Sequence, residues 1–294
     1  MKIKNSIPVL LIFLLLTACK NEFTIFEQID QETELEQAVI TGSVTAVVQS
    51  GDKLYACDGY IYSKNVTDTR DWSKIVGGPR GNIIKVAADS THIYALNSNK
   101  ELYISSNGTA WSKHDVSGTL SSIETIMSNG LDTAYIYGTA KNATEKTYFT
   151  LTATKTTPTT EITSSVIVKT DKGIYTAKDG TVTGSNNIGS ISDLGVIYSL
   201  TYSKVDNALY AGTNKGLRKL PLDGEGKLTG KDEDPPGNWS ATIKSYNAFA
   251  VIATGTSATD AALYTSTIQT SSTYAKINGL WGYYYSRRNN WNRE

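Results

Sequence analysis

The stretch Lys53–Trp72, KLYACDGYIYSKNVTDTRDW, is written again in altered form at His92–Trp111, HIYALNSNKELYISSNGTAW. In both copies an apolar residue and a Tyr are followed by a second aromatic run and then by a Trp-Ser-Lys triplet. The second copy lies 39 residues after the first. A repeat of this length indicates a supersecondary unit that stacks on copies of itself.

The same unit can be followed to the end of the chain. The apolar-Tyr signature recurs, at intervals of 39, 41, 40, 35 and 54 residues, at Tyr55, Tyr94, Tyr135, Tyr175, Tyr210 and Tyr264. Each signature follows a short apolar run that we expect to be an innermost strand: Val44–Gln49, Ile83–Ala88, Ile123–Ser128, Ser165–Thr170, Val196–Tyr202 and Ala248–Thr254. The short polar turns between them indicate antiparallel hairpins. Four strands per unit of about 40 residues predict an all-β, six-bladed β-propeller; seven blades would need shorter units and fit the spacing less well.

Two segments depart from the repeat. The last interval is long because a charged loop, Leu222–Gly237, is inserted before Trp239. Its carboxylates, Asp232 to Asp234, lack the order of a calcium-binding loop, so we interpret the loop as solvated. The Thr-rich stretch Thr150–Thr163 is expected to form an outer strand with an exposed turn at Pro158.

The repeated aromatic side chains are interpreted as packing residues. Sheets arranged around an axis separate towards the rim, and large flat side chains fill that space well. Repetition around a ring is what packing requires, whereas a single binding site does not require it.

The N-terminus has the order of a secretory signal peptide. Lys2 and Lys4 precede an apolar run, Ile7–Leu16, that is shorter than the roughly 20 residues of a membrane-spanning helix. The next residues, Leu16-Thr17-Ala18-Cys19, resemble the lipobox of bacterial lipoproteins. The resemblance implies that Cys19 is acylated and becomes the first residue after cleavage, which anchors the chain to a membrane.

We therefore expect three parts: a lipoprotein signal peptide at 1–18, a lipid anchor and tether at 19–37, and a β-propeller domain at 38–294. Lys20 differs from the Asp of retained lipoproteins, so the resemblance implies the outer membrane. An ordinary signal peptide with a chance cysteine is the alternative.

The charge balance bears on which partners the chain can bind, and the cysteine content bears on whether it can form a disulfide. Without Lys2 and Lys4 the basic residues fall from 28 to 26 against 28 acidic ones. This balance predicts no nucleic-acid partner. With Cys19 acylated, Cys57 has no cysteine to pair with, and its place in a strand pattern predicts a buried structural thiol.

One hairpin, Ser105–Trp111, resembles the Asp-box, or BNR repeat, of sialidase-type propellers, whose pattern is S-x-D-x-G-x-T-W. Asn107 stands where that pattern has Asp, and one residue is missing before the Trp. The tail segment Tyr285–Trp291 resembles the same pattern more weakly. In that family the box is a structural turn, so the resemblance implies a fold and no catalytic role.

The motifs of known chemistry are absent from the sequence. Sialidase-type catalysis uses an arginine triad with a Tyr/Glu pair, and no Arg follows an innermost strand at that family's spacing. His92 and His114 stand singly, without the spacing of a zinc site. We expect no catalytic residue, no metal and no cofactor.

The C-terminal segment Gly279–Glu294 combines aromatic and basic residues at the density of a binding hot spot. We take it as a candidate binding surface made by Trp281, Tyr283, Tyr284, Tyr285, Arg287, Arg288 and Trp291. The alternative is that this segment closes the ring by completing the last sheet beside the first.

These patterns predict a lipid-anchored envelope lipoprotein whose β-propeller is a non-enzymatic scaffold for an unidentified envelope protein or glycan. A sialidase-like or lyase-type glycan-processing enzyme is the alternative, and a displayed surface antigen is a third possibility. An enzyme would place carboxylates and cations together at the mouth of the inner strands, whereas a scaffold would have a bland axis and a broad surface patch.

Overall fold

The computed structural model describes most of the chain from Ile40 onward. It describes residue 40 and residues 44–67, 72–160, 162–185, 188–234, 247–255, 262–270, 275–285 and 291–293, with side chains up to Ser266. The predicted signal peptide, the predicted anchor at Cys19 and the tether lie outside these residues. Within them, the structure contains no helix with the length and hydropathy needed to cross a bilayer.

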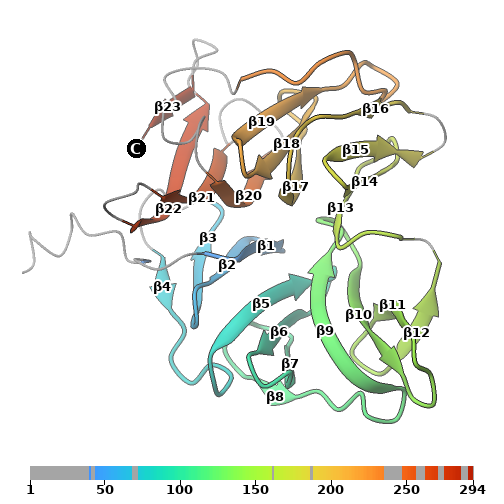
Figure 1. Cartoon of the computed structure of the whole chain (residues 1–294). Helices are drawn as coiled ribbons and strands as arrows, with labels where there is room; N and C mark the ends of the chain where they lie inside the picture. The colour runs from blue at the N-terminus through green and yellow to red at the C-terminus, as the bar shows by residue number, and fades with distance from the viewer. Residues whose placement is uncertain are drawn as a thin grey trace, which may run out of the picture. The chain divides into compact units, whose positions relative to one another are not determined.

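The compact unit Val39–Glu294 is built from six antiparallel sheets (Figure 1). The first contains β1 (Ala46–Ser50), β2 (Lys53–Cys57), β3 (Ile61–Asn65) and β4 (Ser73–Lys74), and the second contains β5 (Ile83–Ala88), β6 (Ile93–Asn97), β7 (Leu102–Ser105) and β8 (Ser112–Lys113). The third contains β9 (Leu120–Ser128), β10 (Ala134–Ala140), β11 (Lys146–Leu151) and β12 (Thr156–Thr159).

The second half of the unit continues the same pattern. The fourth sheet contains β13 (Val166–Lys169), β14 (Ile174–Lys178), β15 (Thr181–Gly184) and β16 (Ser190–Ile191), and the fifth contains β17 (Ile197–Ser203), β18 (Ala208–Thr213) and β19 (Gly216–Pro221). The sixth contains β20 (Asn247–Thr254), β21 (Ala262–Thr270), β22 (Ala275–Tyr285) and β23 (Trp291–Arg293). Every sheet is a meander in which strands adjacent in sequence are paired.

The first strand of each meander is the innermost one. Around the ring, contacts run from β1 to β5, β9, β13, β17 and β20, and β20 contacts β1 again. Sheets that meet in a closed circle through their first strands form a β-propeller. The prediction of an all-β propeller is therefore confirmed, and the predicted innermost strands agree with the observed ones to within a few residues.

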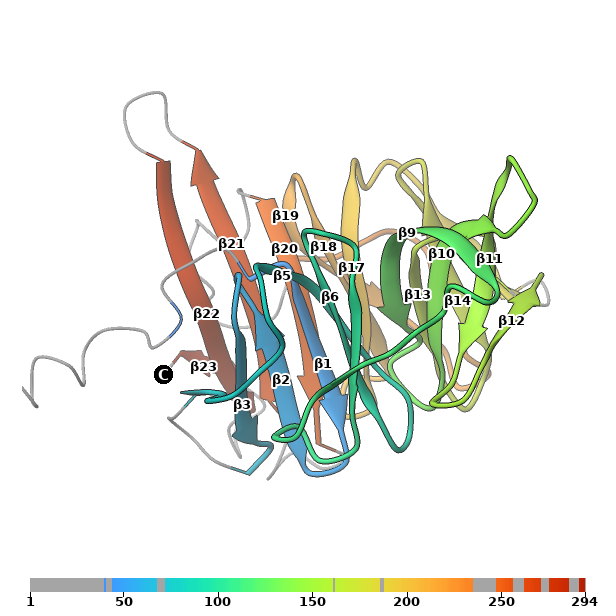
Figure 2. The same ribbon diagram turned by 90° about the horizontal axis from the view of Figure 1, so that it is seen from below.

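The last sheet meets the first through residues about 200 positions apart in sequence. The Val44 amide donates to Ser266 Oγ at 3.2 Å, and Lys64 Nζ donates to the hydroxyl of Tyr264 at 2.9 Å. Trp72 packs edge-on against the Tyr264 ring, with the ring centroids 6.2 Å apart. Strands β20 and β21 of the last sheet and β1 and β2 of the first run alongside one another in Figure 2. These contacts close the ring.

The prediction of a six-bladed propeller is wrong, because five of the sheets form complete blades. Five sheets have the four strands of a complete blade, whereas the fifth sheet along the chain has three. After β19 the chain enters the inserted loop, where the described residues form only isolated bridges, such as Leu222 with Leu228. Leu228 is buried, and its amide donates to the carbonyl of Ile188 in the neighbouring sheet at 2.8 Å. The segment around Leu228, which could have supplied a fourth strand, packs against the preceding blade instead.

Hairpin turns are made by residues that tolerate a left-handed backbone. Asp179 and Gly180, between β14 and β15, both have positive φ, 49° and 76°. A two-residue hairpin requires this pair of conformations, because its twist then matches that of the strands. The Asp-Gly sequence therefore sets the register that pairs Lys178 with Thr181.

The six signature tyrosines form the packing between blades. Tyr55, Tyr94, Tyr135, Tyr175, Tyr210 and Tyr264 all lie on the second strand of their sheets, and each is at most 2% exposed. Buried hydroxyls need a partner. Tyr94 donates to Asp89 Oδ2 at 2.7 Å, and Tyr210 donates to Asp206 Oδ2 at 2.9 Å. The interpretation of these residues as packing residues is confirmed.

Two local predictions need correction. Pro158 lies within β12, the outer strand of its sheet, and pairs with Phe149 instead of forming a turn. An outer strand can hold a proline because one side of it makes no ladder hydrogen bonds. The acidic loop is also not simply solvated, since Arg218 lies 2.9 Å from Asp234 and 3.6 Å from Asp232.

Candidate functional site

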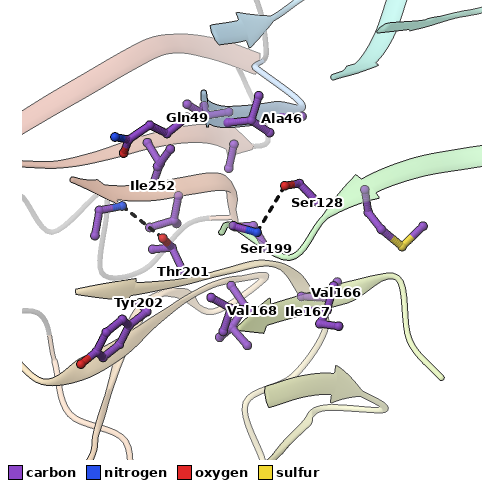
Figure 3. Close-up of a pocket in the computed structure, with 18 of the residues that line it drawn as sticks. Ala46, Gln49, Ser128, Val166, Ile167, Val168, Ser199, Thr201, Tyr202 and Ile252 are labelled. Atoms are coloured by element: carbon purple, nitrogen blue, oxygen red, sulfur yellow. Dashed lines mark hydrogen bonds between the residues drawn. The ribbon is translucent and has the colours of Figure 1, made fainter. Parts of the chain in front are cut away.

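A cavity of about 550 Å³ lies where the six inner strands meet. We call it the axial cavity. All six inner strands, β1, β5, β9, β13, β17 and β20, contribute residues to its wall. Figure 3 shows Ala46, Val166 and Ser199 converging on this space from three different strands. Much of the wall is aliphatic, which is the usual character of a pocket that binds a small molecule.

Strand register places one residue of each inner strand at an equivalent level of the axial cavity. Each lies two positions before the residue that pairs with the signature tyrosine of its sheet. We call this set the axial ring; its members are Ala46, Lys85, Thr125, Val166, Ser199 and Ala250, and all six line the cavity. Lys85 is the charged member of the ring.

In four of the six inner strands a β-bulge precedes the axial ring residue. Immediately before that residue the strand register of β5, β9, β17 and β20 skips one position, namely Ile84, Glu124, Tyr198 and Phe249. A bulge adds a residue, bends the strand and turns the next side chain to a new direction, and it is found often at the rims of barrels and beside binding sites. We call these four residues the bulged rim. Each of them comes one position before the axial ring residue of its strand. The four therefore lie at one level, towards the start of the inner strands.

An aromatic pair forms part of the bulged rim. The rings of Tyr198 and Phe249 stack with centroids 4.6 Å apart and planes at 27°. Both side chains are partly exposed. Elsewhere on the rim, Glu124 pairs with Lys146 Nζ at 2.9 Å, and its carbonyl accepts a hydrogen bond from Lys100 Nζ. The rim therefore offers an apolar ring face on one side and lysines on another.

Lys85 brings a positive charge into the wall of the axial cavity. Its Nζ donates to the carbonyl of Thr45 at 2.8 Å. Burial lowers the pKa of Lys85, and the neighbouring Cys57 opposes this to a smaller extent. Thr45 in turn donates its hydroxyl to the carbonyl of Ile84, which ties the first residue of the bulged rim to the first sheet.

Cys57 is fully buried behind this lysine. Burial raises its pKa, while its contact with the Thr45 hydroxyl at 3.3 Å and the charge of Lys85 act in the opposite direction. A thiol that is inaccessible and kept protonated does not act as a nucleophile. The prediction of a buried structural thiol at Cys57 is confirmed.

The other end of the axial cavity is polar and mixed in charge. Lys169 pairs with Asp132 at 2.9 Å, and the amide side chain of Asn129 donates to the same carboxylate. Lys204 is exposed, and Leu131 presents 58% of its surface to solvent. This end is an open mouth, in contrast to the bulged rim with its stacked rings.

Two hydroxyl groups in the cavity wall are buried without a hydrogen-bond partner among the described residues. They are Ser199 Oγ, in the axial ring, and Thr254 Oγ1, near the open mouth. An unsatisfied buried hydroxyl costs about 1–3 kcal/mol, so such groups mark positions where a ligand or water can bond.

The two histidines lie on either side of one tyrosine, and neither lines the axial cavity. His92 and His114 flank Tyr94, with ring centroids 6.3 and 6.2 Å from the tyrosine ring. Burial lowers the pKa of His114. In the described part of the chain, no group of three His, Cys, Asp or Glu residues is placed to hold a metal ion.

The predicted C-terminal surface falls at the edge of what the structure describes. Trp281, Tyr283, Tyr284 and Tyr285 belong to β22, and Trp291 belongs to β23, as backbone positions in the last sheet. Their side chains, together with Arg287, Arg288 and Cys19, lie outside the described residues. The described backbone of Gly279–Tyr285 thus continues the last sheet.

The sequence interpretation missed the axial ring. A signal was available, since Lys85 interrupts the apolar run IIKVAA of Ile83–Ala88 and Glu124 interrupts the next inner run. The bulges and the alignment of the six strands depend on pairing between strands, which the sequence of one strand does not contain.

Comparison with known proteins supplies a family. Residues 3–228 match the TP013X lipoprotein family. Two relatives from Treponema pallidum (strain Nichols), each described as an uncharacterized lipoprotein, are similar over shorter stretches. One is 31% identical over 103 residues, 34% of this chain, and the other 30% identical over 139 residues, 46% of this chain. The matched segments span 27% of the length of each relative.

Solved structures with a similar outline include two propellers. The β-propeller domain of Cps50 (Swd1) from Myceliophteria thermophila gives a TM-score of 0.49 at 10% identity, covering 87% of this chain and 88% of the other. The WD40 β-propeller domain of Doa1 gives 0.47 at 11%, covering 83% and 93%. The propeller fold of this chain follows from its own sheets and from the contacts between their inner strands. The match over residues 3–228 covers most of the sequence, and the chain therefore belongs to the TP013X lipoprotein family.

Proposed function

We propose that this chain is a lipid-anchored protein of the cell envelope whose propeller binds a ligand or partner without catalysing a reaction. Membership of a lipoprotein family supports the anchor, and the lipobox at Leu16–Cys19 supplies the residue that would carry it. Acyl chains contribute about 0.8 kcal/mol per buried CH₂, so two or more chains hold a folded domain at a bilayer. Lys20 after the cysteine favours the outer membrane.

The single observation that carries the binding role is the axial cavity. It is preformed, it has the size of small-molecule sites, about 300–1,000 Å³, and it presents a few polar groups in a largely aliphatic wall. The axis therefore differs from the bland axis that we expected of a scaffold. We therefore place the binding function at the axis, and we keep the C-terminal aromatic segment as a second predicted contact surface for an envelope protein or glycan.

The Asp-box resemblance belongs to this proposal as a structural turn. Ser105 Oγ accepts a hydrogen bond from the Gly108 amide at 2.8 Å, and Asn107 Oδ1 accepts from the amides of Thr109 and Ala110, both at 2.9 Å. The Trp111 indole donates to the Gly108 carbonyl at 3.0 Å. Asn107 can thus take the turn-forming place that Asp has in the sialidase-type box.

The alternative function is a sialidase-like or lyase-type enzyme of the envelope. Such an enzyme needs an acid and a base that converge on the substrate. Among the described residues of the cavity wall, Asp171 is the one carboxylate, and it lies near Lys169 at the open mouth. The binding role requires no such pair, which is why we prefer it.

The test compares the wild-type chain with Cys19→Ser in the native host. Labelling with an alkyne-tagged fatty acid should mark the wild type and the Cys57→Ser control, and should fail for Cys19→Ser. Crosslinking in the envelope followed by affinity recovery should give a defined complex that requires Cys19. Turnover of envelope glycans by the purified chain would replace the binding role with the enzymatic one.

A further inference from the structure

Lys85 is a partly buried cation whose charge is not balanced by a carboxylate. No ion pair within 4.0 Å includes Lys85 in the part of the chain that the structure describes. Lysines elsewhere on the propeller do have such partners, as Lys146 has in Glu124 and Lys169 in Asp132. Charges inside proteins are normally paired, because removing them from water is costly.

The ammonium group of Lys85 still has bonding capacity. A lysine has three N–H donors, and the structure assigns one of them to the Thr45 carbonyl. Burial lowers the pKa of Lys85, which is the effect of desolvating a charge that lacks a counter-ion. An anionic group in the cavity would accept the remaining hydrogen bonds and would stabilise the charged form.

A polar residue lies at the same level of the axial ring on another blade. Ser199 lies at the ring position of β17 that corresponds to Lys85 in β5, and its buried hydroxyl has no hydrogen-bond partner among the described residues. Strands β5 and β17 belong to the second and fifth sheets of the ring, so the two side chains approach from well-separated blades. The Ser199 hydroxyl itself lies close to Gly212 of β18, so the anion is held by Lys85.

The remaining wall of the axial cavity is suited to hydrocarbon. Aliphatic side chains from several inner strands line it, including Val47, Ile126, Val166, Leu200 and Val251. A ligand that fits both parts of the wall has one charged end and an apolar body. Transfer of such a body from water contributes about 25 cal/mol per Å² of buried surface.

We propose that the axial cavity binds an anionic amphiphile of the fatty-carboxylate class, with its carboxylate on Lys85 and its chain against the aliphatic wall. This inference rests on the proposed binding function and names its ligand class. Tyr198, which stacks on Phe249, lines the cavity from the bulged rim.

Calorimetric titration of dodecanoate, below its micellar concentration, into the mature chain carrying Cys19→Ser tests the proposal. We expect saturable binding with one site, and weak or no binding of acetate and inorganic phosphate, which lack the apolar body. Lys85→Met should weaken binding about tenfold or more, as expected for loss of a charge-assisted hydrogen bond. Lys85→Arg should retain most of the affinity.

Lys204→Met is the matched control, because Lys204 also lines the cavity but is exposed at the open mouth. It should bind dodecanoate like the parent chain. Circular dichroism establishes that each variant is folded, and Lys85→Gln, which should weaken binding in the same way, carries the test should Lys85→Met unfold. No binding to the parent chain, or equal binding by Lys85→Met and Lys85→Arg, overturns the proposal. Either result leaves the envelope complex tested with Cys19→Ser unaffected, so the two failures can be told apart.

Discussion

Gly212→Ala tests how neighbouring blades pack beside the bulged rim. Gly212 lies on β18 and pairs with Ser199, next to the bulge at Tyr198. A Cβ added at Gly212 would overlap the carbonyl oxygen of Ala248 on β20, in the next sheet. The same atom would lie 2.6 Å from Ser199 Oγ and 3.0 Å from Val251 Cγ2.

The expected loss of stability follows from the kind of atom that is met. The Ala248 oxygen belongs to the backbone of the adjacent blade, so no side-chain rotation relieves the overlap. Overpacking of this kind costs about 1–3 kcal/mol. Replacing a glycine also reduces the entropy of the unfolded chain, which stabilises by about 0.4–1 kcal/mol. The balance is a loss of about 1–2 kcal/mol, which lowers Tm by roughly 2–8 °C for a domain of this size.

Thermal unfolding followed by circular dichroism measures this loss, with Gly224→Ala as the matched control. A Cβ at Gly224 meets no heavy atom within 4 Å, so its Tm should stay the same or rise slightly. If Gly212→Ala melts at or above the wild-type temperature, the close approach of β18 to β20 is not present in the protein.

Three further predictions concern single side chains. Tyr94→Phe removes the hydrogen bond to Asp89 and should lower the free energy of unfolding by about 1.5–3 kcal/mol in urea titrations, whereas an unchanged midpoint would contradict that bond. Hydrogen bonds, first of all from Asn129, hold the pKa of Asp132 at about 2 in the folded chain, below its ordinary value near 3.8. Its contribution to stability is thus present above pH 4 and lost as the pH falls towards 2; Asp132→Asn should flatten this part of the stability–pH curve, and an unaltered slope would argue against it. Cys57 should react with iodoacetamide only after unfolding, and rapid labelling of the native chain would show that it is not buried.

The sequence predicts best the features that repeat. The predicted inner strand Ile83–Ala88 matches β5 residue for residue, and the signature tyrosines identify the second strand of every sheet. These features are local, because a strand and its hairpin are set by alternation and turn residues close in sequence. The count of complete blades failed because the fate of the inserted loop depends on contacts of Leu228 with a different blade.

The candidate site shows where prediction from sequence stops. Lys85 was visible as a charge inside an apolar run, but its position at the axis follows from register and from ring closure. The pairing of Tyr198 with Phe249 joins residues on two different sheets, and no spacing rule connects them. The sequence predicts either a binding surface or a closing strand for the C-terminal segment. The described backbone of Ala275–Tyr285 forms β22 of the closing sheet.

Closure of the ring by the first and last sheets is the central claim, because the axial cavity exists only if β20 meets β1. A double-mutant cycle on Lys64 and Tyr264, which lie 2.9 Å apart and 200 positions apart in sequence, tests it most directly. Unfolding free energies of Lys64→Met, Tyr264→Phe and the double variant give their interaction free energy. The account predicts an interaction of about 1 kcal/mol or more. Effects that simply add, to within about 0.3 kcal/mol, would mean that the two sheets do not meet.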